Sequence, residues 1–117
     1  MIDINGKFVF LSGPMTGLPD LNRKAFAEAE ELCLSLGAKI AFNPREAWGH
    51  TDKDRSWYMR RDLHRLTLSD GDEPMFDLVV QLDGWEHSNG AWCESRVAEE
   101  CGIPCVPLRA LTEVDDG

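Results

Sequence analysis

Short apolar runs alternate with longer amphipathic stretches along this chain, and this alternation constrains the fold more than any other sequence feature. The apolar runs cover residues 7–12, 38–42, 75–82 and 103–108. The stretches with apolar residues at helical spacing cover residues 21–36, 56–68 and 88–101. Strands that alternate with helices usually pair in parallel. The sequence therefore predicts an α/β domain, a Rossmann-like or flavodoxin-like three-layer sandwich around a small, mostly parallel sheet of four to five strands.

Two connecting segments and the C-terminal end are predicted to lie outside this framework. Residues 45–56 are polar and predict an irregular surface loop of a length that is often functional. The sequence Asp-Gly-Asp-Glu-Pro at 70–74 predicts a break in the chain before the third strand. We expect residues 1–110 to form a single domain and 111–117 to form an acidic tail in solvent.

The acidic balance of the chain excludes one class of partner. The 117 residues include 12 Lys and Arg against 21 Asp and Glu, which gives a net charge of −9. A nucleic acid polymer is held by clustered basic residues, so we expect no nucleic acid partner, whereas a single nucleoside or nucleotide is compatible with this charge.

No apolar run approaches the roughly 20 residues of a membrane span, and the first residues lack the features of a secretory signal. We expect no membrane partner and a cytoplasmic location.

The cysteines and histidines do not form a metal-binding pattern. Cys33, Cys93, Cys101 and Cys105 contain no C-x-x-C pair, and no histidine lies near them at ligand spacing. Reduced thiols in a cytosolic protein explain them. We expect no metal and no other cofactor.

Two strand-to-helix turns are predicted to bring backbone amides to the carboxyl edge of the sheet, where ligands of such folds bind. Residues 12–17 combine glycines with hydroxyl groups that can bind an anion or a sugar, although an ordinary tight turn also explains them. At residues 88–90, Ser88 either caps a helix or helps to bind a phosphate. Asp83 either binds a sugar hydroxyl or is a turn residue. The candidate substrate-binding residues are Ser12, Gly13, Pro14, Met15, Thr16, Asp83, Ser88, Asn89 and Gly90.

Two carboxylates are predicted on the core-facing sides of helices that border this edge. At about 100° per residue, Glu94 shares a helix face with Ala91 and Cys101, where an ionised carboxylate is costly unless it is used or paired. Asp62 lies at the edge of the apolar stripe of the preceding helix. Converging carboxylates suit retaining N-glycosidic chemistry, in which one attacks the anomeric carbon and the other moves the proton of the base. The alternative is a structural ion pair with an arginine, which for Asp62 is Arg65.

The opposite face of the 88–101 helix carries a tryptophan among charged residues. Trp92 lies beside Arg96 and Glu99, so its indole is predicted to be exposed. Exposed tryptophan is typical of interfaces, and we expect a homodimer or a larger homo-oligomer.

Four segments of the chain together resemble a known family. They are Phe8–Gly17, Asp62-Leu63, Asp77–Val80 and Ser88–Gly90 with Glu94. They are similar to the nucleoside 2-deoxyribosyltransferase superfamily, which includes the 2'-deoxynucleoside 5'-phosphate N-hydrolases. The resemblance covers residues 7–108, and the sequence Gly-Pro-Met-Thr-Gly at 13–17 is most like the small phage and bacterial branch of this superfamily.

The resemblance implies roles for individual residues. Glu94 matches the nucleophile that forms a glycosyl-enzyme at the anomeric carbon, and Asp62 matches the acid that protonates the departing base. Residues 13–16 and 88–90 match the segments that hold the 5' end of the sugar or its phosphate. Members of the superfamily are commonly dimers or larger.

Three hypotheses follow. The first is an enzyme that cleaves or transfers at the N-glycosidic bond of a nucleoside or nucleoside 5'-monophosphate. The second is a nucleotide-binding module without turnover, because Phe10 stands where active members usually carry a tyrosine that orients the nucleophile. The third is a structural oligomer in which Glu94 and Asp62 are ion-paired. The carboxylates discriminate between them: an enzyme needs both to face a cleft about 5–5.5 Å apart, whereas in the structural oligomer an arginine covers each.

Overall fold

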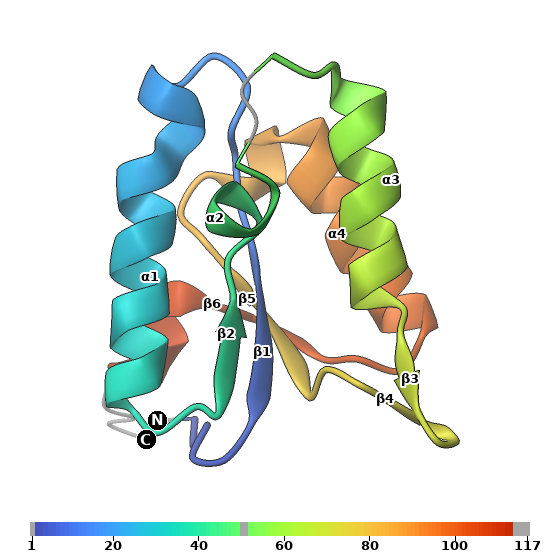
Figure 1. The fold of residues 1–117 in the computed structure, drawn as a ribbon. Coiled ribbons are helices and arrows are strands. Elements are labelled where there is room, and N and C mark those ends of the chain that lie inside the picture. Colours follow the sequence, from blue (N-terminus) through green and yellow to red (C-terminus); the bar gives the residue numbers. More distant parts are fainter. Residues whose placement is uncertain (1, 50–51, 114–117) are drawn as a thin grey trace.

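The computed structural model describes residues 2–49 and 52–113, and it confirms the predicted three-layer α/β sandwich (Figure 1). A four-stranded parallel sheet with the order β2-β1-β5-β6 forms the middle layer. Its strands are β1 (Phe8–Ser12), β2 (Ile40–Phe42), β5 (Leu78–Gln81) and β6 (Cys105–Pro107). The main helices are α1 (Arg23–Ser35), α3 (Arg55–Leu66) and α4 (Asn89–Glu100). Helix α1 covers one face of the sheet, and α3 and α4 cover the other.

Strand β1 contributes to two hydrophobic cores because successive side chains of a strand point to opposite faces. Val9 and Leu11 are fully buried between the sheet and α1. Phe10 is fully buried between the sheet and the α3–α4 pair. A parallel sheet needs cover on both faces, so the apolar run of β1 is continuous rather than alternating.

The helices α3 and α4 begin at the edge where the parallel strands end (Figure 1). Asp54 caps α3 by accepting a hydrogen bond from the backbone N–H of Trp57 at 2.9 Å. Ser88 caps α4 by accepting from the N–H of Ala91 at 3.3 Å, which confirms its role as an N-cap. The positive ends of both helix dipoles therefore lie at the carboxyl edge of the sheet.

The prediction of an irregular loop over residues 45–56 is wrong for its first part. A short helix, α2 (Pro44–Trp48), follows β2 directly. The Asn43 side chain accepts hydrogen bonds from the N–H groups of Arg45 and Glu46, at 3.0 and 3.4 Å, and Pro44 takes the first helical position. Asn43-Pro44 therefore ends a strand and begins a helix at once.

The segment predicted only to break the chain forms a small hairpin. Strands β3 (Ser69–Asp70) and β4 (Glu73–Pro74) pair in antiparallel fashion, and Gly71 in their turn has a φ of 63°. The strand that follows is shorter than predicted: β5 covers residues 78–81, whereas the sequence predicted 75–82.

Within the described residues, three short 3₁₀ helices complete the fold: η1 (Pro19–Asn22), η2 (Trp85–His87) and η3 (Leu108–Leu111). Leu111, the first residue of the predicted tail, is fully buried in the α1-side core. Glu113 of that tail is exposed and lies 3.6 Å from Arg109, and residues 114–117 fall outside the described part of the chain. No helix in the described ranges has the length and apolarity needed to cross a membrane.

Candidate active site

A cavity of about 270 Å³ lies at the carboxyl edge of the sheet, between the turn after β1 and the helices α3 and α4. This is the edge where the sequence predicted a ligand site. The cavity is lined by Gly13, Met15, Thr16, Leu21, Lys53, Arg55, Tyr58, Met59, Asp62, Ser88, Gly90, Ala91 and Glu94. Both predicted carboxylates and five of the predicted substrate-binding residues are therefore in one place.

The two carboxyl groups meet across the helix pair, Asp62 from α3 and Glu94 from α4. Their side chains are almost completely buried, at 3% and 4% exposure, and they are within hydrogen-bonding contact of each other. The Ser12 hydroxyl at the end of β1 donates to Glu94 Oε1 at 2.6 Å. The indole N–H of Trp48 at the end of α2 donates to Asp62 Oδ1, also at 2.6 Å. Each carboxyl is thus held by one neutral donor.

Burial controls the protonation of this pair. It raises the pKa of Glu94 well above its usual range, and the negative charge of Asp62 raises that pKa further, while the Ser12 hydrogen bond opposes part of the shift. Burial also raises the pKa of Asp62, but the hydrogen bonds from Glu94 and Trp48 oppose it. Two carboxylates in contact cannot both ionise cheaply. The pair therefore retains one proton at a pH where exposed carboxyls have lost theirs, and Glu94 is its principal holder.

The enzyme hypothesis expects two carboxyls that face a cleft about 5–5.5 Å apart, and here both line the cavity and are in hydrogen-bonding contact. A shared proton removes the repulsion that would keep two carboxylates apart. Among the described residues, neither Asp62 nor Glu94 forms an ion pair with an arginine. The alternative partner Arg65 lies instead with its guanidinium 5.0 Å from the ring centre of Phe42.

The predicted substrate-binding residues divide into four groups. Gly13, Met15, Thr16, Ser88 and Gly90 line the cavity. Ser12 is buried behind it and contacts Glu94 instead of the cavity. Pro14 and Asp83 line a separate hollow of about 440 Å³ against α1. Asn89 is exposed and lines neither cavity.

Close backbone approach is a real requirement at Gly13. A Cβ atom built there would lie 2.7 Å from Cβ of Leu82, closer than side chains pack. At Gly90 the nearest atom would be the sulfur of Met59, at 3.4 Å, which is tight but adjustable. The glycine at position 13 therefore lets the turn after β1 pass close to Leu82, the residue that follows β5.

Phe10 does not reach the carboxyl pair. Its ring is fully buried, stacks on Phe42 with centroids 5.3 Å apart and meets Phe76 edge-on at 5.4 Å. The hydroxyl that contacts Glu94 comes from Ser12, two residues further along the same strand face. Glu94 therefore has a hydroxyl donor, although the side chain at position 10 carries none.

Cys101 was predicted to share the buried face of α4 with Glu94, and that prediction is wrong. Cys101 is exposed because the helix ends at Glu100 and the chain turns there. The buried residues of α4 are Ala91, Glu94, Ser95 and Ala98. In the described residues, no group of three or more His, Cys, Asp or Glu side chains is arranged to hold a metal ion.

Several residues that line the cavity were not identified from the sequence. Lys53 and Arg55 bring two cations to the cavity, and Tyr58, the single tyrosine of the chain, lies one helical turn before Asp62. The one available signal was a pair of cations at the start of a helix, Lys53 before the capping Asp54 and Arg55 after it. No signal predicted Leu21, which lines the cavity from a stretch of left-handed backbone.

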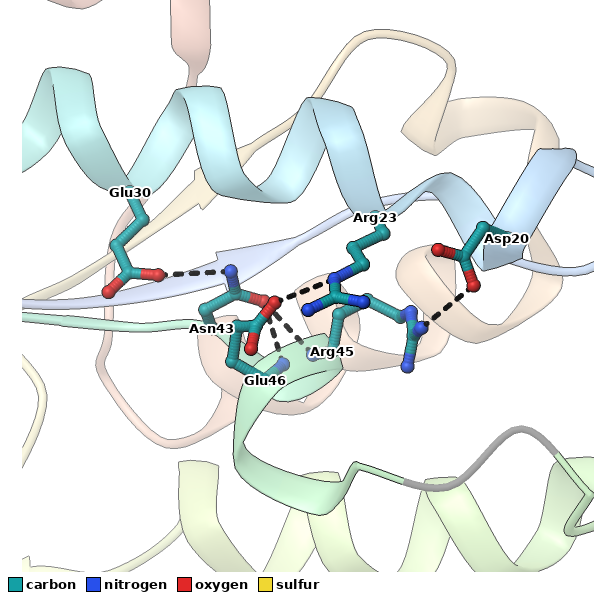
Figure 2. Close-up of polar contacts among 6 residues, drawn as sticks. All are labelled: Asp20, Arg23, Glu30, Asn43, Arg45 and Glu46. Carbon is teal, nitrogen blue, oxygen red and sulfur yellow. Dashed lines mark hydrogen bonds and ion pairs between the residues drawn. The ribbon is translucent and has the colours of Figure 1, made fainter.

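A polar network anchors α2 to α1 and to the η1 turn before it (Figure 2). Trp48 is the last residue of α2. Asn43 Nδ2 donates to Glu30 of α1 at 3.0 Å, and Arg23 Nε donates to Glu46 of α2 at 3.0 Å. The buried Arg45 lies 3.5 Å from Asp20. The ring of Trp48 then packs edge-on against Phe42, with centroids 5.7 Å apart. This arrangement fixes the indole that donates to Asp62. The members of the network are Asp20, Arg23, Glu30, Asn43, Arg45 and Glu46.

The fold and the cavity define an α/β protein with a paired-carboxyl pocket at the carboxyl edge of a parallel sheet. Residues 7–107 match the family described as a domain of unknown function, DUF4406, and the chain belongs to this family. No curated protein and no solved structure matches the chain.

Proposed function

We propose that this protein cleaves or transfers at the N-glycosidic bond of a nucleoside 5'-monophosphate or nucleoside. The observation that carries the proposal is the contact between Glu94 and Asp62 at the floor of the cavity, each held by a neutral donor. Retaining chemistry needs one carboxylate to attack and another to move a proton. The resemblance to the nucleoside 2-deoxyribosyltransferase superfamily assigns these roles to the same two residues.

The reaction begins with a shift of the shared proton from Glu94 to Asp62 along the hydrogen bond between them. The Glu94 carboxylate then forms a bond to the anomeric carbon while the carbon–nitrogen bond breaks. The electron pair of that bond leaves with the base, whose nitrogen takes the proton from Asp62. The products of this step are a glycosyl ester on Glu94 and a free base.

The ester is resolved in one of two ways. In hydrolysis, Asp62 takes a proton from water, the water oxygen bonds to the anomeric carbon, and Glu94 leaves as a carboxylate. In transfer, the nitrogen of a second base makes that bond and gives its proton to Asp62. Both routes restore the pair with one proton.

The charge of the cavity favours a substrate with a 5'-phosphate. Lys53 and Arg55 bring two cations to the lining of a protein with a net charge of −9. Arg55 precedes Asp62 by seven residues on α3, about 10 Å along the helix axis. The capped start of α4 at Ser88 adds the positive end of a helix dipole on the other wall. An anionic group near these residues leaves the sugar free to reach the carboxyl pair.

The test is base release, measured by chromatography over a panel of nucleosides and 5'-monophosphates. We expect release by the parent chain and none by Glu94→Gln. Glu99→Gln is the matched control on the same helix, because Glu99 is half exposed and pairs with Arg96 on the outer face. Release that persists undiminished in Glu94→Gln would contradict the assignment of the nucleophile.

The preference for a 5'-phosphate is tested by comparing KM for a 5'-monophosphate with KM for the matching nucleoside. We expect Arg55→Gln to raise KM for a 5'-monophosphate about tenfold or more and to leave KM for the matching nucleoside nearly unchanged, because a charge-assisted hydrogen bond contributes about 1.5–3 kcal/mol. Ligand-dependent thermal stabilisation without base release would instead favour a nucleotide-binding module. The absence of both would favour a structural oligomer.

We also propose that the protein acts in the cytoplasm as a homodimer or a larger homo-oligomer. The free thiols of Cys33, Cys93, Cys101 and Cys105 suit a reducing compartment. Trp92 is 50% exposed on the outer face of α4, as the sequence predicted, and offers an apolar contact for a second copy. Sedimentation of the parent chain and Trp92→Glu tests the assembly, which the variant should weaken.

A further inference from the structure

We infer that Trp48 and Ser12 are a pair of positioning residues that together control which of the two carboxyls holds their shared proton. Trp48 stabilises the carboxylate that Asp62 becomes when it gives its proton to the base, and Ser12 stabilises the carboxylate form in which Glu94 acts as the nucleophile. The inference rests on the proposed function, but it concerns residues to which neither the resemblance nor the sequence assigned this role. It is carried by the two 2.6 Å hydrogen bonds and by the packing that fixes them.

The Trp48 indole is a donor with no acceptor capacity, so its hydrogen bond is strongest when Asp62 is ionised. The ring cannot turn away easily, because it packs edge-on against Phe42 and ends a helix that Asn43 caps. Asp62 is 3% exposed, and water therefore offers little competition for this contact. The indole consequently stabilises the carboxylate form of Asp62 specifically.

The Ser12 hydroxyl does the same for Glu94 from the opposite side. It comes from the last residue of β1, which pairs with Gln81 of β5 in the middle of the sheet. Its short contact with Glu94 Oε1 lies in a fully buried environment. The two carboxyls thus have separate donors on separate elements, α2 for one and β1 for the other.

Other titratable groups lie near the pair, and in the described residues no lysine or arginine forms an ion pair with it. Lys53, Arg55 and Tyr58 line the cavity from the start of α3, and Cys93 on α4 lies close enough to disfavour ionisation of Glu94. Arg65, one turn further along α3, is turned toward the Phe42 ring. The direct contacts to the carboxyl oxygens include the two neutral donors and the partner carboxyl.

This arrangement assists the step in which the base leaves. Asp62 loses its proton to the base nitrogen, so negative charge develops on Asp62 just where the indole N–H points. The Trp48 hydrogen bond becomes stronger in that transition state than in the state with protonated Asp62 that immediately precedes it, so the indole favours transfer of the proton to the base. Ser12 orients Glu94 for attack, and its bond weakens as Glu94 becomes an ester.

The pH profile of kcat/KM distinguishes these roles from simple structural support. The pair is active with one proton, so the acid limb reports the first ionisation and the alkaline limb the second. We expect Trp48→Phe to move the acid limb up by about one pH unit and to leave the alkaline limb in place. Ser12→Ala should move the alkaline limb up by a similar amount and leave the acid limb in place. Trp92→Phe, the same substitution at a half-exposed site, should move neither.

A second measurement needs no activity. The chain has four tryptophans, so a ¹⁵N-labelled sample gives four indole N–H signals, and the one lost in Trp48→Phe is assigned to Trp48. We expect that signal to move with pH as Asp62 ionises and to stop moving in Asp62→Asn. A Trp48 signal that ignores pH, or limbs that stay fixed in both variants, would overturn the inference. An indole that titrates without base release from any substrate would refute the proposed function and leave the proton arrangement intact.

Discussion

Glu94→Gln should stabilise the fold at neutral pH, although it removes the proposed nucleophile. Glu94 is 4% exposed and its pKa is raised, so the folded chain keeps a proton that the unfolded chain releases above a pH of about 4.5. The free energy of unfolding of the parent therefore falls as pH rises through this window, by about 1.4 kcal/mol per pH unit. The fall ends at the raised pKa of Glu94. A glutamine escapes this loss, because it accepts from Ser12 and donates to Asp62 without a charge.

Thermal unfolding measured from pH 4 to pH 9 gives the difference in Tm between the parent and Glu94→Gln. For a domain of this size, 1.4 kcal/mol corresponds to roughly 5 °C in Tm, so the curves should separate by about that amount for each pH unit above 4.5. They should meet at the acid end, where both states are protonated. Glu99→Gln, with a side chain 54% exposed, should follow the parent at every pH. Parallel curves for the parent and Glu94→Gln would refute the argument that burial raises the pKa of Glu94.

Three further substitutions test the scaffold by urea unfolding. Asn43→Ala removes the cap of α2 and should lower the free energy of unfolding by about 1 kcal/mol; no change would mean that the cap contributes nothing. Gly13→Ala forces Cβ against Leu82 and should cost about 1–3 kcal/mol, and a variant as stable as the parent would show that the turn moves freely. Phe10→Ala empties the ring stack with Phe42 and should cost about 3–5 kcal/mol, and a loss below 1 kcal/mol would contradict the packing.

The fold could be predicted because the long-range order of the chain follows from local periodicity. Continuous apolar runs mark the strands of a parallel sheet that is covered on both faces, and helical spacing marks the crossovers. Helix α2 was missed because five residues are too few to show a period. The dipeptide Asn43-Pro44 is typical of a turn after a strand and equally typical of a helix start, with Asn as the cap and Pro as the first helical residue. The sequence therefore does not distinguish the two.

The site was predictable where a residue conflicts with its own helix face. Glu94 stands among small apolar residues of α4, and its burial confirms that reasoning. Trp48 and Asp62 lie on different helices, 14 positions apart, and only the packing of α2 against the sheet brings them together. Helical periodicity carries no information about such a contact. A buried indole N–H usually needs a hydrogen-bond acceptor, so Trp48 indicates that an acceptor is present, but it does not indicate which residue provides it.

The Ser12–Glu94 hydrogen bond joins positions separated by 82 residues, most of the length of the domain. The floor of the cavity therefore exists only after β1 has paired with β5 and α4 has docked, and no shorter folding unit can assemble it. A small molecule that fills the cavity binds the completed chain and nothing that precedes it. At a hundred times its Kd it would add about 2.7 kcal/mol to the stability of the native state. Because proteases act on the open chain, the lifetime of this protein in a cell would follow the supply of its own ligand.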